Sequence, residues 1–164
     1  MPEFRHRLAP TLLGFFGLSG TAGAQCIDYG DFLHWAGAVA TPDDAYGVAI
    51  AGRHVYVACA SSGFQVVEIG VPSSPEIVGS VDTPGEARGV AARGSFAYVA
   101  DEVGLSVIDV TDPFLPQVLG SVETPGTANA VAVDGDFAYV ADLSGLRVVR
   151  GLLPCSRAAS VLIP

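Results

Sequence analysis

The sequence predicts an all-β fold made of repeated four-stranded antiparallel units, and three observations support that prediction. First, a stretch of two short apolar runs joined by a turn occurs three times, once as GSFAYVADEVGLSVIDV at residues 94–110. Second, the runs are separated by turn-forming residues, because the chain contains 20 Gly and 11 Pro. Third, 50% of the residues are apolar and only 15% are charged, which is typical of a globular chain rather than a disordered one.

The repeat has a period of about 40 residues. The dipeptide Thr-Pro recurs at Thr41-Pro42, Thr83-Pro84 and Thr124-Pro125, so the spacings are 42 and 41 residues. A Tyr followed by Val-Ala occupies the same place in each unit, at Tyr56, Tyr98 and Tyr139. The first unit has one extra residue before Gly63, which corresponds to Gly104 and Gly145.

Each unit is expected to contain four short strands. In the second unit these are residues 89–92, 96–100, 105–110 and 117–122. Gly94 turns the chain between the first two strands, and the equivalent Asp134-Gly135 is a strong hairpin signal. Gly104 is expected to supply a positive φ in the next turn. Pro113 and Pro116 predict a longer loop before the fourth strand, because a central strand does not tolerate proline.

Four antiparallel strands with a period of about 40 residues are the signature of a β-propeller blade. Tyr98, Val99 and Ala100 are apolar at consecutive positions, so both faces of that strand are expected to be buried between neighbouring blades. The small residues at 90–92 and 131–133 are expected to line the narrow axis. A parallel β-helix is the rival interpretation, but its rungs are shorter and contain no internal hairpin.

The expected blades are residues 41–82, 83–123 and 124–150, and residues 26–40 resemble the back half of a preceding blade, with Trp35 in its last strand. About three blades are fewer than the four to eight of a closed propeller, so a partial or open propeller is expected. Residues 151–164 break the repeat. A frameshift or truncation near Arg150 is the favoured explanation, and a tail that caps the last blade is the alternative. Open blade edges favour self-association.

Residues 1–24 have the form of a secretory signal peptide. A basic start with Arg5 and Arg7 precedes an apolar run and the cleavage motif at residues 22–24. The run is too short to span a bilayer, so no membrane insertion is expected. Cys26 would suit a lipoprotein, but Gln25 stands where lipidation needs a small residue. We therefore expect cleavage near Ala24 and a secreted, periplasmic or cell-surface product.

The pattern A-Y-V-A-D-x-x-x-G-L-x-V-I-D-V-x-D-P-x-x-P-x-x-x-G-S-V-x-T-P-G resembles the LVIVD repeat of exported bacterial proteins. It is more distantly similar to the surface-layer YVTN repeat. The resemblance covers residues 27–149 and implies a β-propeller in a large secreted or cell-surface protein. It brings no catalytic motif with it. The WD40 signature is absent, since no Trp-Asp ends the third strand.

Few residues offer metal or thiol chemistry. His6 lies in the leader, and neither His34 nor His54 belongs to a metal-ligand spacing. The cysteines form no C-x-x-C motif, and at least one of them must be free or intermolecular; they are Cys26, Cys59 and Cys155. Cys59 falls within a strand and is expected to be a small buried residue.

Carboxylates on loops are the remaining candidates. Asp134, Asp136, Asp101 and Glu102 are expected at one rim, where they could take Ca²⁺, but the EF-hand ladder is missing and turn formation is favoured. Asp28 and Asp109 each follow Ile and are expected to bond backbone or neighbouring-blade groups.

The formal net charge of −9 disfavours binding to nucleic acid or to anionic lipid. No nucleophile elbow, phosphate-binding loop or H-E-x-x-H motif occurs, so no catalytic, cofactor-binding or metal residue is expected. The sequence therefore predicts a non-catalytic module that binds or scaffolds a protein or glycan. The alternative is a lactonase-like or quinoprotein-like propeller enzyme. That alternative needs polar residues at the axis, where the expected first strands offer Val, Ala and Ile.

Overall fold

The computed structural model describes residues 35–151, which form eleven strands in three antiparallel sheets. The first sheet contains β1 (Gly47–Ala51), β2 (His54–Ala58), β3 (Phe64–Glu68) and β4 (Glu76–Val81). The second contains β5 (Ala87–Arg93), β6 (Phe96–Asp101), β7 (Gly104–Asp109) and β8 (Gln117–Glu123). The third contains β9 (Ala128–Asp134), β10 (Phe137–Asp142) and β11 (Gly145–Arg150). Over this part of the chain no helix is long and apolar enough to cross a bilayer.

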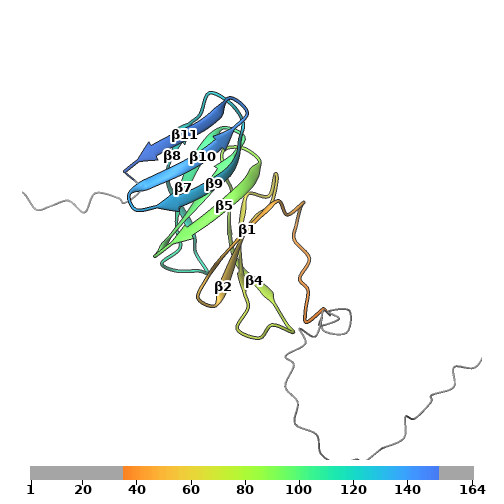
Figure 1. The fold of residues 1–164 in the computed structure, drawn as a ribbon. Helices are drawn as coiled ribbons and strands as arrows, with labels where there is room; N and C mark the ends of the chain where they lie inside the picture. The colour runs from red at the N-terminus through yellow and green to blue at the C-terminus, as the bar shows by residue number, and fades with distance from the viewer. Residues whose placement is uncertain (1–34, 152–164) are drawn as a thin grey trace, which may run out of the picture. The chain divides into compact units, whose positions relative to one another are not determined.

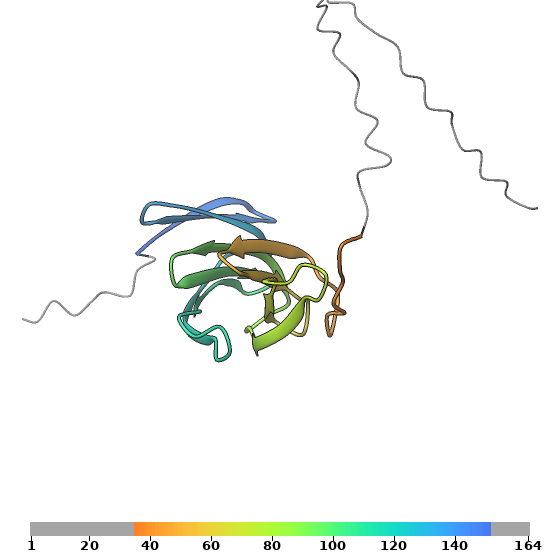
Figure 2. The same cartoon turned by 90° about the horizontal axis from the view of Figure 1, so that it is seen from below.

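The sheets are three consecutive propeller blades, as the period predicted. Within each sheet the strands follow one another in sequence order, and the third sheet has three strands. The first strands of the sheets, β1, β5 and β9, are neighbours across the sheet boundaries (Figure 1). The turned view in Figure 2 shows the strands of the three sheets stacked against one another. The all-β, partial-propeller prediction is therefore confirmed.

The apolar core lies between the sheets. One cluster joins the first two sheets through residues that include Tyr56, Phe64 and Ile108. A second cluster joins the second and third sheets, and Tyr98 and Leu105 lie at its centre with no more than 1% of their surface exposed. The central sheet is therefore covered on both faces, as the consecutive apolar residues of β6 predicted.

The glycine turns follow the prediction in the hairpins after the first strands, whereas in the turns after the second strands Gly63 and Gly145 have a positive φ and Gly104 does not. Gly52, Gly94 and Gly135 have φ of 61°, 59° and 53° in the hairpins after β1, β5 and β9, as the Asp-Gly signal indicated. Gly104 does not have the expected positive φ. It is needed for space, because a Cβ there would collide with the Val122 carbonyl oxygen on β8.

A repeated glycine–proline contact joins neighbouring blades. A Cβ built at Gly79 in β4 would collide with the Pro113 carbonyl oxygen and lie 3.0 Å from the Pro116 ring. Gly120 is the equivalent residue of β8, and no described atom lies within 4 Å of a Cβ built there. The glycine of one fourth strand therefore receives the proline loop of the next blade.

Residues 35–40 contact the proline loop of the first blade in the way that a fourth strand does, but they do not form a strand in this structure. A Cβ at Gly37 would meet Pro72 and Pro75 in the way that Gly79 meets the next pair of prolines. The prediction that Trp35 lies in a strand is wrong, because residues 35–40 have no strand pairing and Trp35 is 94% exposed. The strand expected to pair with them, near Ile27, lies outside the described residues.

Several other predictions also fall outside residues 35–151. They concern the signal peptide at residues 1–24 and the tail after Gly151, together with Cys26, Asp28, His6, His34 and Cys155.

Candidate functional site

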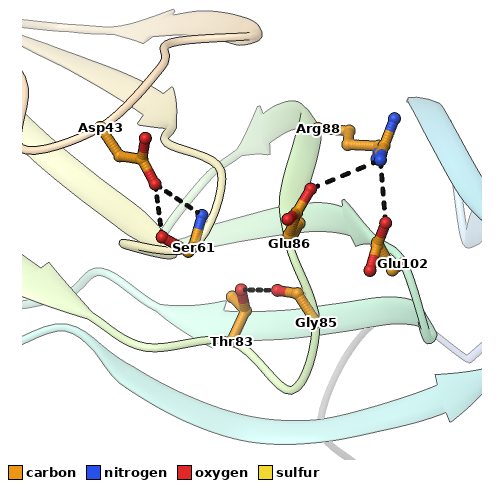
Figure 3. Close-up of polar contacts among 7 residues, drawn as sticks. All are labelled: Asp43, Ser61, Thr83, Gly85, Glu86, Arg88 and Glu102. Carbon is orange, nitrogen blue, oxygen red and sulfur yellow. Dashed lines mark hydrogen bonds and ion pairs between the residues drawn. The ribbon is translucent and has the colours of Figure 1, made fainter.

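The candidate site is the end of the sheets where β1, β5 and β9 begin, which we call the Thr-Pro rim. Because the strands are antiparallel, this end also carries the turns after β2, β6 and β10 and the links that follow β4 and β8. The hydroxyls of Thr41, Thr83 and Thr124 each donate to the carbonyl two residues ahead, at 2.8, 2.8 and 2.7 Å. The dipeptide that sets the period therefore shapes the same turn in each link, as Figure 3 shows for Thr83 and Gly85.

The innermost strands of neighbouring blades meet backbone to backbone at this rim. A Cβ at Gly47 would lie 2.8 Å from the Arg88 carbonyl oxygen, and one at Gly89 would lie 2.8 Å from that of Asn129. The residues that precede Gly47, Gly89 and the equivalent Ala130 in the sequence occupy the same place in each repeat. They are Tyr46, Arg88 and Asn129, which we call the inner-strand trio.

Two members of the inner-strand trio stand at β-bulges. Ala87 pairs with Asp101 and Gly89 with Ala100, which leaves Arg88 as the extra residue. In the third sheet the register skips Asn129 in the same way. A bulge re-aims a side chain and often marks a binding or catalytic site. The strands β5 and β9 begin two and three residues before the expected positions 89 and 131, so Arg88 and Asn129 were not predicted to lie on the innermost strands. The available signal was the polar column Tyr46, Arg88 and Asn129 in the aligned repeats.

Arg88 is held between two carboxylates (Figure 3). Its Nη2 donates to Glu102 Oε1 at 2.8 Å and lies 3.4 Å from Glu86 Oε2. The guanidinium carbon is 5.9 Å from the centroid of the Tyr46 ring, within the range of a cation–π contact. Its Nε is buried and has no hydrogen-bond partner among the described residues. Buried donors are normally satisfied, so this Nε stands out among the polar atoms of the described residues.

A second polar contact on the rim ties the first blade to its incoming segment. The Asp43 carboxylate accepts hydrogen bonds from the Ser61 hydroxyl and from the Ser61 N–H, the latter at 3.2 Å (Figure 3). The hydrogen bond from the Ser61 hydroxyl, followed by that from the Asp44 N–H, lowers the pKa of Asp43 below its ordinary value. The group is therefore a carboxylate at neutral pH.

The carboxylates at the end of β6 and β10 shape turns. Asp101 is 1% exposed and accepts from the N–H groups of Val103 and Gly104 and from the Ser106 hydroxyl, each at 2.9 Å. Asp142 accepts from the Ser144 N–H at 2.8 Å and from Arg147 Nε at 3.1 Å.

The first blade has Cys59 in the equivalent position, where it is buried as expected and its thiol is free. A cysteine is a weak acceptor, and Gln65 donates instead to the Ser62 carbonyl at 2.8 Å. Gln65 occupies the position of Ser106 and Arg147 on the third strand. The turn of each blade is therefore fastened by a side chain from the third strand.

The expected carboxylate rim is wrong in one respect. Asp134 and Asp136 flank Gly135 in the turn after β9, whereas Asp101 and Glu102 lie at the turn after β6, which is the opposite end of a sheet. The two pairs of carboxylates lie at opposite ends of the sheets, so the four groups cannot bind one ion together. Across residues 35–151, no group of three or more His, Cys, Asp or Glu side chains is placed to hold a metal ion.

Two other predicted residues have structural partners. His54 Nε2 lies 3.0 Å from Glu68 Oε2, and Arg53 pairs with the other oxygen of the same carboxylate at 2.7 Å. Asp109 accepts from the Thr111 N–H at 2.8 Å, as expected for a backbone-bonding residue. The Thr111 hydroxyl and then its N–H lower the pKa of Asp109.

Three solved structures resemble this chain over part of their own length. A gluconolactonase from Xanthomonas campestris is 22% identical with a TM-score of 0.54, and the match covers 68% of this chain and 39% of the enzyme. The computationally designed protein Ika8 is 12% identical with a TM-score of 0.56, over 66% of this chain and 34% of Ika8. A luciferin-regenerating enzyme is 18% identical with a TM-score of 0.47, over 70% of this chain and 40% of that enzyme.

This chain thus spans about two-fifths of the length of the gluconolactonase. A comparison with curated proteins finds no significant match. The prediction that the protein is not an enzyme is corrected, because the fold that it adopts is also the fold of an enzyme. A missing sequence motif therefore does not exclude catalysis on these blades.

The family is identified by the repeats themselves. The model of the LVIVD repeat matches residues 42–83, 84–124 and 125–149, which together make up more than half of the chain. Each match begins at the Pro of a Thr-Pro link and covers one described sheet, the third match ending one residue before the end of β11. The chain belongs to the LVIVD-repeat family of β-propeller proteins.

Proposed function

We propose that this chain is an exported ligand-binding propeller module that contacts a glycan through its Thr-Pro rim. The observation that carries the proposal is the inner-strand trio, which puts an aromatic ring, a guanidinium and an amide at equivalent positions where the innermost strands converge. Export rests on the signal-like residues 1–24 and on the resemblance to exported proteins.

The chemistry of the rim favours a neutral, polyhydroxylated ligand over an anionic one. Arg88 is already neutralised by Glu86 and Glu102, and Asp43 adds another carboxylate. Sugar hydroxyls can both donate to carboxylates and accept from amide or guanidinium groups. The Tyr46 ring is 58% exposed and offers an apolar face beside these polar groups. A protein partner was the other ligand class expected from the sequence.

The test is a glycan-array measurement with the labelled full chain. We expect binding to a limited set of neutral glycans and an affinity at least about tenfold weaker for Arg88→Ala, which is the loss of about 1.4 kcal/mol. Asn129→Ala tests a second member of the trio. Arg93→Ala is the matched control, because Arg93 lies at the opposite end of the same strand and is exposed.

Circular dichroism of each variant checks that the sheets remain folded. Absence of glycan binding by the folded wild type would contradict the proposal. Equal loss in the Arg88 and Arg93 variants would place the ligand elsewhere.

Hydrolysis of a sugar lactone is the second candidate. It is favoured by the fold shared with a gluconolactonase and by the carboxylates beside Arg88 on the rim. The assay follows acid release from gluconolactone in a pH-stat, with the spontaneous rate subtracted, with and without added Ca²⁺. Activity that is lost in Glu102→Gln but kept in Glu76→Gln, an exposed control on β4, would support catalysis at this rim.

A further inference from the structure

The two outer sheets of the propeller each leave an apolar face open. On the first sheet this leading face holds a groove of about 350 Å³, in whose lining Val48 and Val39 are 67% and 36% exposed, whereas Val57 and Val67 are buried. On the third sheet the trailing face carries Phe137, Tyr139, Leu146 and Val148, which are 37%, 36%, 64% and 57% exposed. Neighbouring apolar residues exposed in this way mark an interaction surface.

The two open faces are the two halves of the blade–blade interface. Inside the molecule, Tyr56 and Phe64 lie in one cluster with Val90 of the next sheet. Tyr139 and Leu146 occupy the places of Tyr56 and Phe64 in the third unit.

The leading face holds the other half of the same interface. Val48 and Val57 occupy the places of Val90 and Val99 in the first unit. Val90 is 9% exposed but Val48 is 67% exposed, and Leu105 is 1% exposed but its equivalent Leu146 is 64% exposed. The trailing face of one copy therefore has the side chains that fit the leading face of another.

Counting the blades selects the number of copies. A contact between unlike faces continues from copy to copy until the rotation closes a ring. Closed propellers contain about four to eight blades, and the only multiple of three in that range is six. Two copies therefore close the ring, with a trailing-to-leading contact at each of its two junctions.

Over residues 35–151 the third sheet has three strands, and the incoming segment is placed to supply a fourth. Gly37 sits on Pro72 and Pro75 as Gly79 sits on the prolines of the next blade, so residues 35–41 lie where a preceding blade has its fourth strand. In a ring of two copies, that preceding blade is the third sheet of the partner subunit, whose outer strand β11 pairs only with β10 among the described residues.

The repeat also gives the register of this pairing. Leu105 pairs with Val122 and Val107 with Gly120 across β7 and β8. The equivalent pairs are Leu146 with Val39 of the partner subunit and Val148 with Gly37 of the partner subunit.

The geometry points to a homodimer in which two chains form one six-bladed ring and residues 35–41 of each chain complete the third sheet of the other. This inference does not rest on the proposed glycan binding, because a monomer could present the same inner-strand trio.

Light scattering with size exclusion on the full chain is the first test. We expect a discrete species of twice the chain mass that dissociates on dilution. Trp35 is the only tryptophan and is 94% exposed in the single chain, so its emission is expected to shift to the blue as the dimer forms. A folded monomer at all concentrations, or open-ended aggregation, would overturn the inference.

Face-specific variants separate the ring from other dimers. Leu146→Arg on the trailing face and Val48→Asp on the leading face are each expected to give a monomer. Leu143→Arg is the control, because Leu143 is 77% exposed in the turn after β10, away from both faces.

Mixing the two monomeric variants is expected to restore a one-to-one dimer. One junction then joins two unaltered faces, and the other brings the two introduced, opposite charges together. A dimer that persists in Leu146→Arg, or a mixture that stays monomeric, would contradict the ring. Circular dichroism confirms that each variant is folded.

Discussion

At the scale of single residues, the turns of this propeller depend on buried acceptors at the end of the second strand. Asp101 receives three hydrogen bonds and is nearly inaccessible to solvent. Two of its donors are main-chain N–H groups of a tight turn, which have no other acceptor in that turn. A buried donor left without a partner costs more than the net value of the hydrogen bond that it lost.

We therefore expect Asp101→Ala to lower the free energy of unfolding by about 3 kcal/mol. Asp101→Asn should cost less, since an amide oxygen can still accept from the Val103 and Gly104 N–H groups. The measurement is urea unfolding followed by circular dichroism. Asp112→Ala removes an exposed acceptor for the Phe114 N–H and is the control, expected to change stability by about 0.5 kcal/mol or less. Equal effects of the Asp101 and Asp112 variants would show that burial is not the cause.

Asp142, the equivalent carboxylate of the third blade, is expected to make the stability of the fold depend on pH. Burial alone would raise the pKa of Asp142, but hydrogen bonds from Arg147 and from the Ser144 N–H outweigh it and hold the pKa below its ordinary value. A carboxyl group whose pKa is lower in the folded state stabilises the fold above its unfolded pKa of about 4. That contribution is lost as the pH falls through the lower folded value.

The wild type is thus expected to lose stability as the pH falls below about 4. In Asp142→Asn this loss should be smaller, because the substituted side chain does not titrate. Urea midpoints at pH 7, 4 and 3 for both proteins provide the comparison. Parallel curves for the two proteins would contradict the assignment.

Residue roles could be predicted from the sequence only where the repeat determined them. The backbone role of Asp109 and the burial of Cys59 followed from their places in the unit. Arg88 and Asn129 were missed because a β-bulge adds a residue without changing the apolar pattern on either side. The bulges lie where the innermost strands pack closely at Gly47 and Gly89, and that packing depends on the tertiary structure.

At the scale of strands and loops, the most regular device is the contact between a fourth-strand glycine and the proline loop of the next blade. It recurs at Gly37 and Gly79, which lie on successive blade positions. These glycines and prolines align in the repeat, but the alignment alone does not indicate that they touch. The reason is that the contact joins different blades, whereas the period describes only one.

This contact predicts opposite outcomes for two equivalent glycines. Gly79→Ala should destabilise the protein by about 1–3 kcal/mol, because the added methyl would collide with the Pro113 carbonyl. Gly120→Ala should change stability by about 0.5 kcal/mol or less, since no described atom lies near its Cβ position. Thermal and urea unfolding of both variants give the comparison. A larger loss for Gly120→Ala than for Gly79→Ala would contradict the proposed role of the loop.

At the scale of the whole molecule, the period and the four-strand unit were enough to predict a propeller. They also implied fewer blades than a closed ring contains. The sequence alone could not show which apolar side chains are exposed on the two outer sheets. Exposure of Val48 and Leu146 follows from their position on an outer sheet, since their equivalents in the middle are buried.

Stacked units of this kind are stabilised mainly by their neighbours, so stability should differ along the stack. β6 and β7 lie in the sheet that is covered on both faces, whereas β11 is the edge strand of the third sheet. In hydrogen exchange followed by mass spectrometry, peptides from residues 96–109 should exchange most slowly and those from 145–150 much faster at low protein concentration. If the third sheets are completed by a second chain, protection of residues 145–150 should rise with concentration while that of residues 96–109 stays nearly constant. Uniform protection at every concentration would mean that the edge of β11 is already paired in the single chain, and that the outer sheets do not depend on a partner for their stability.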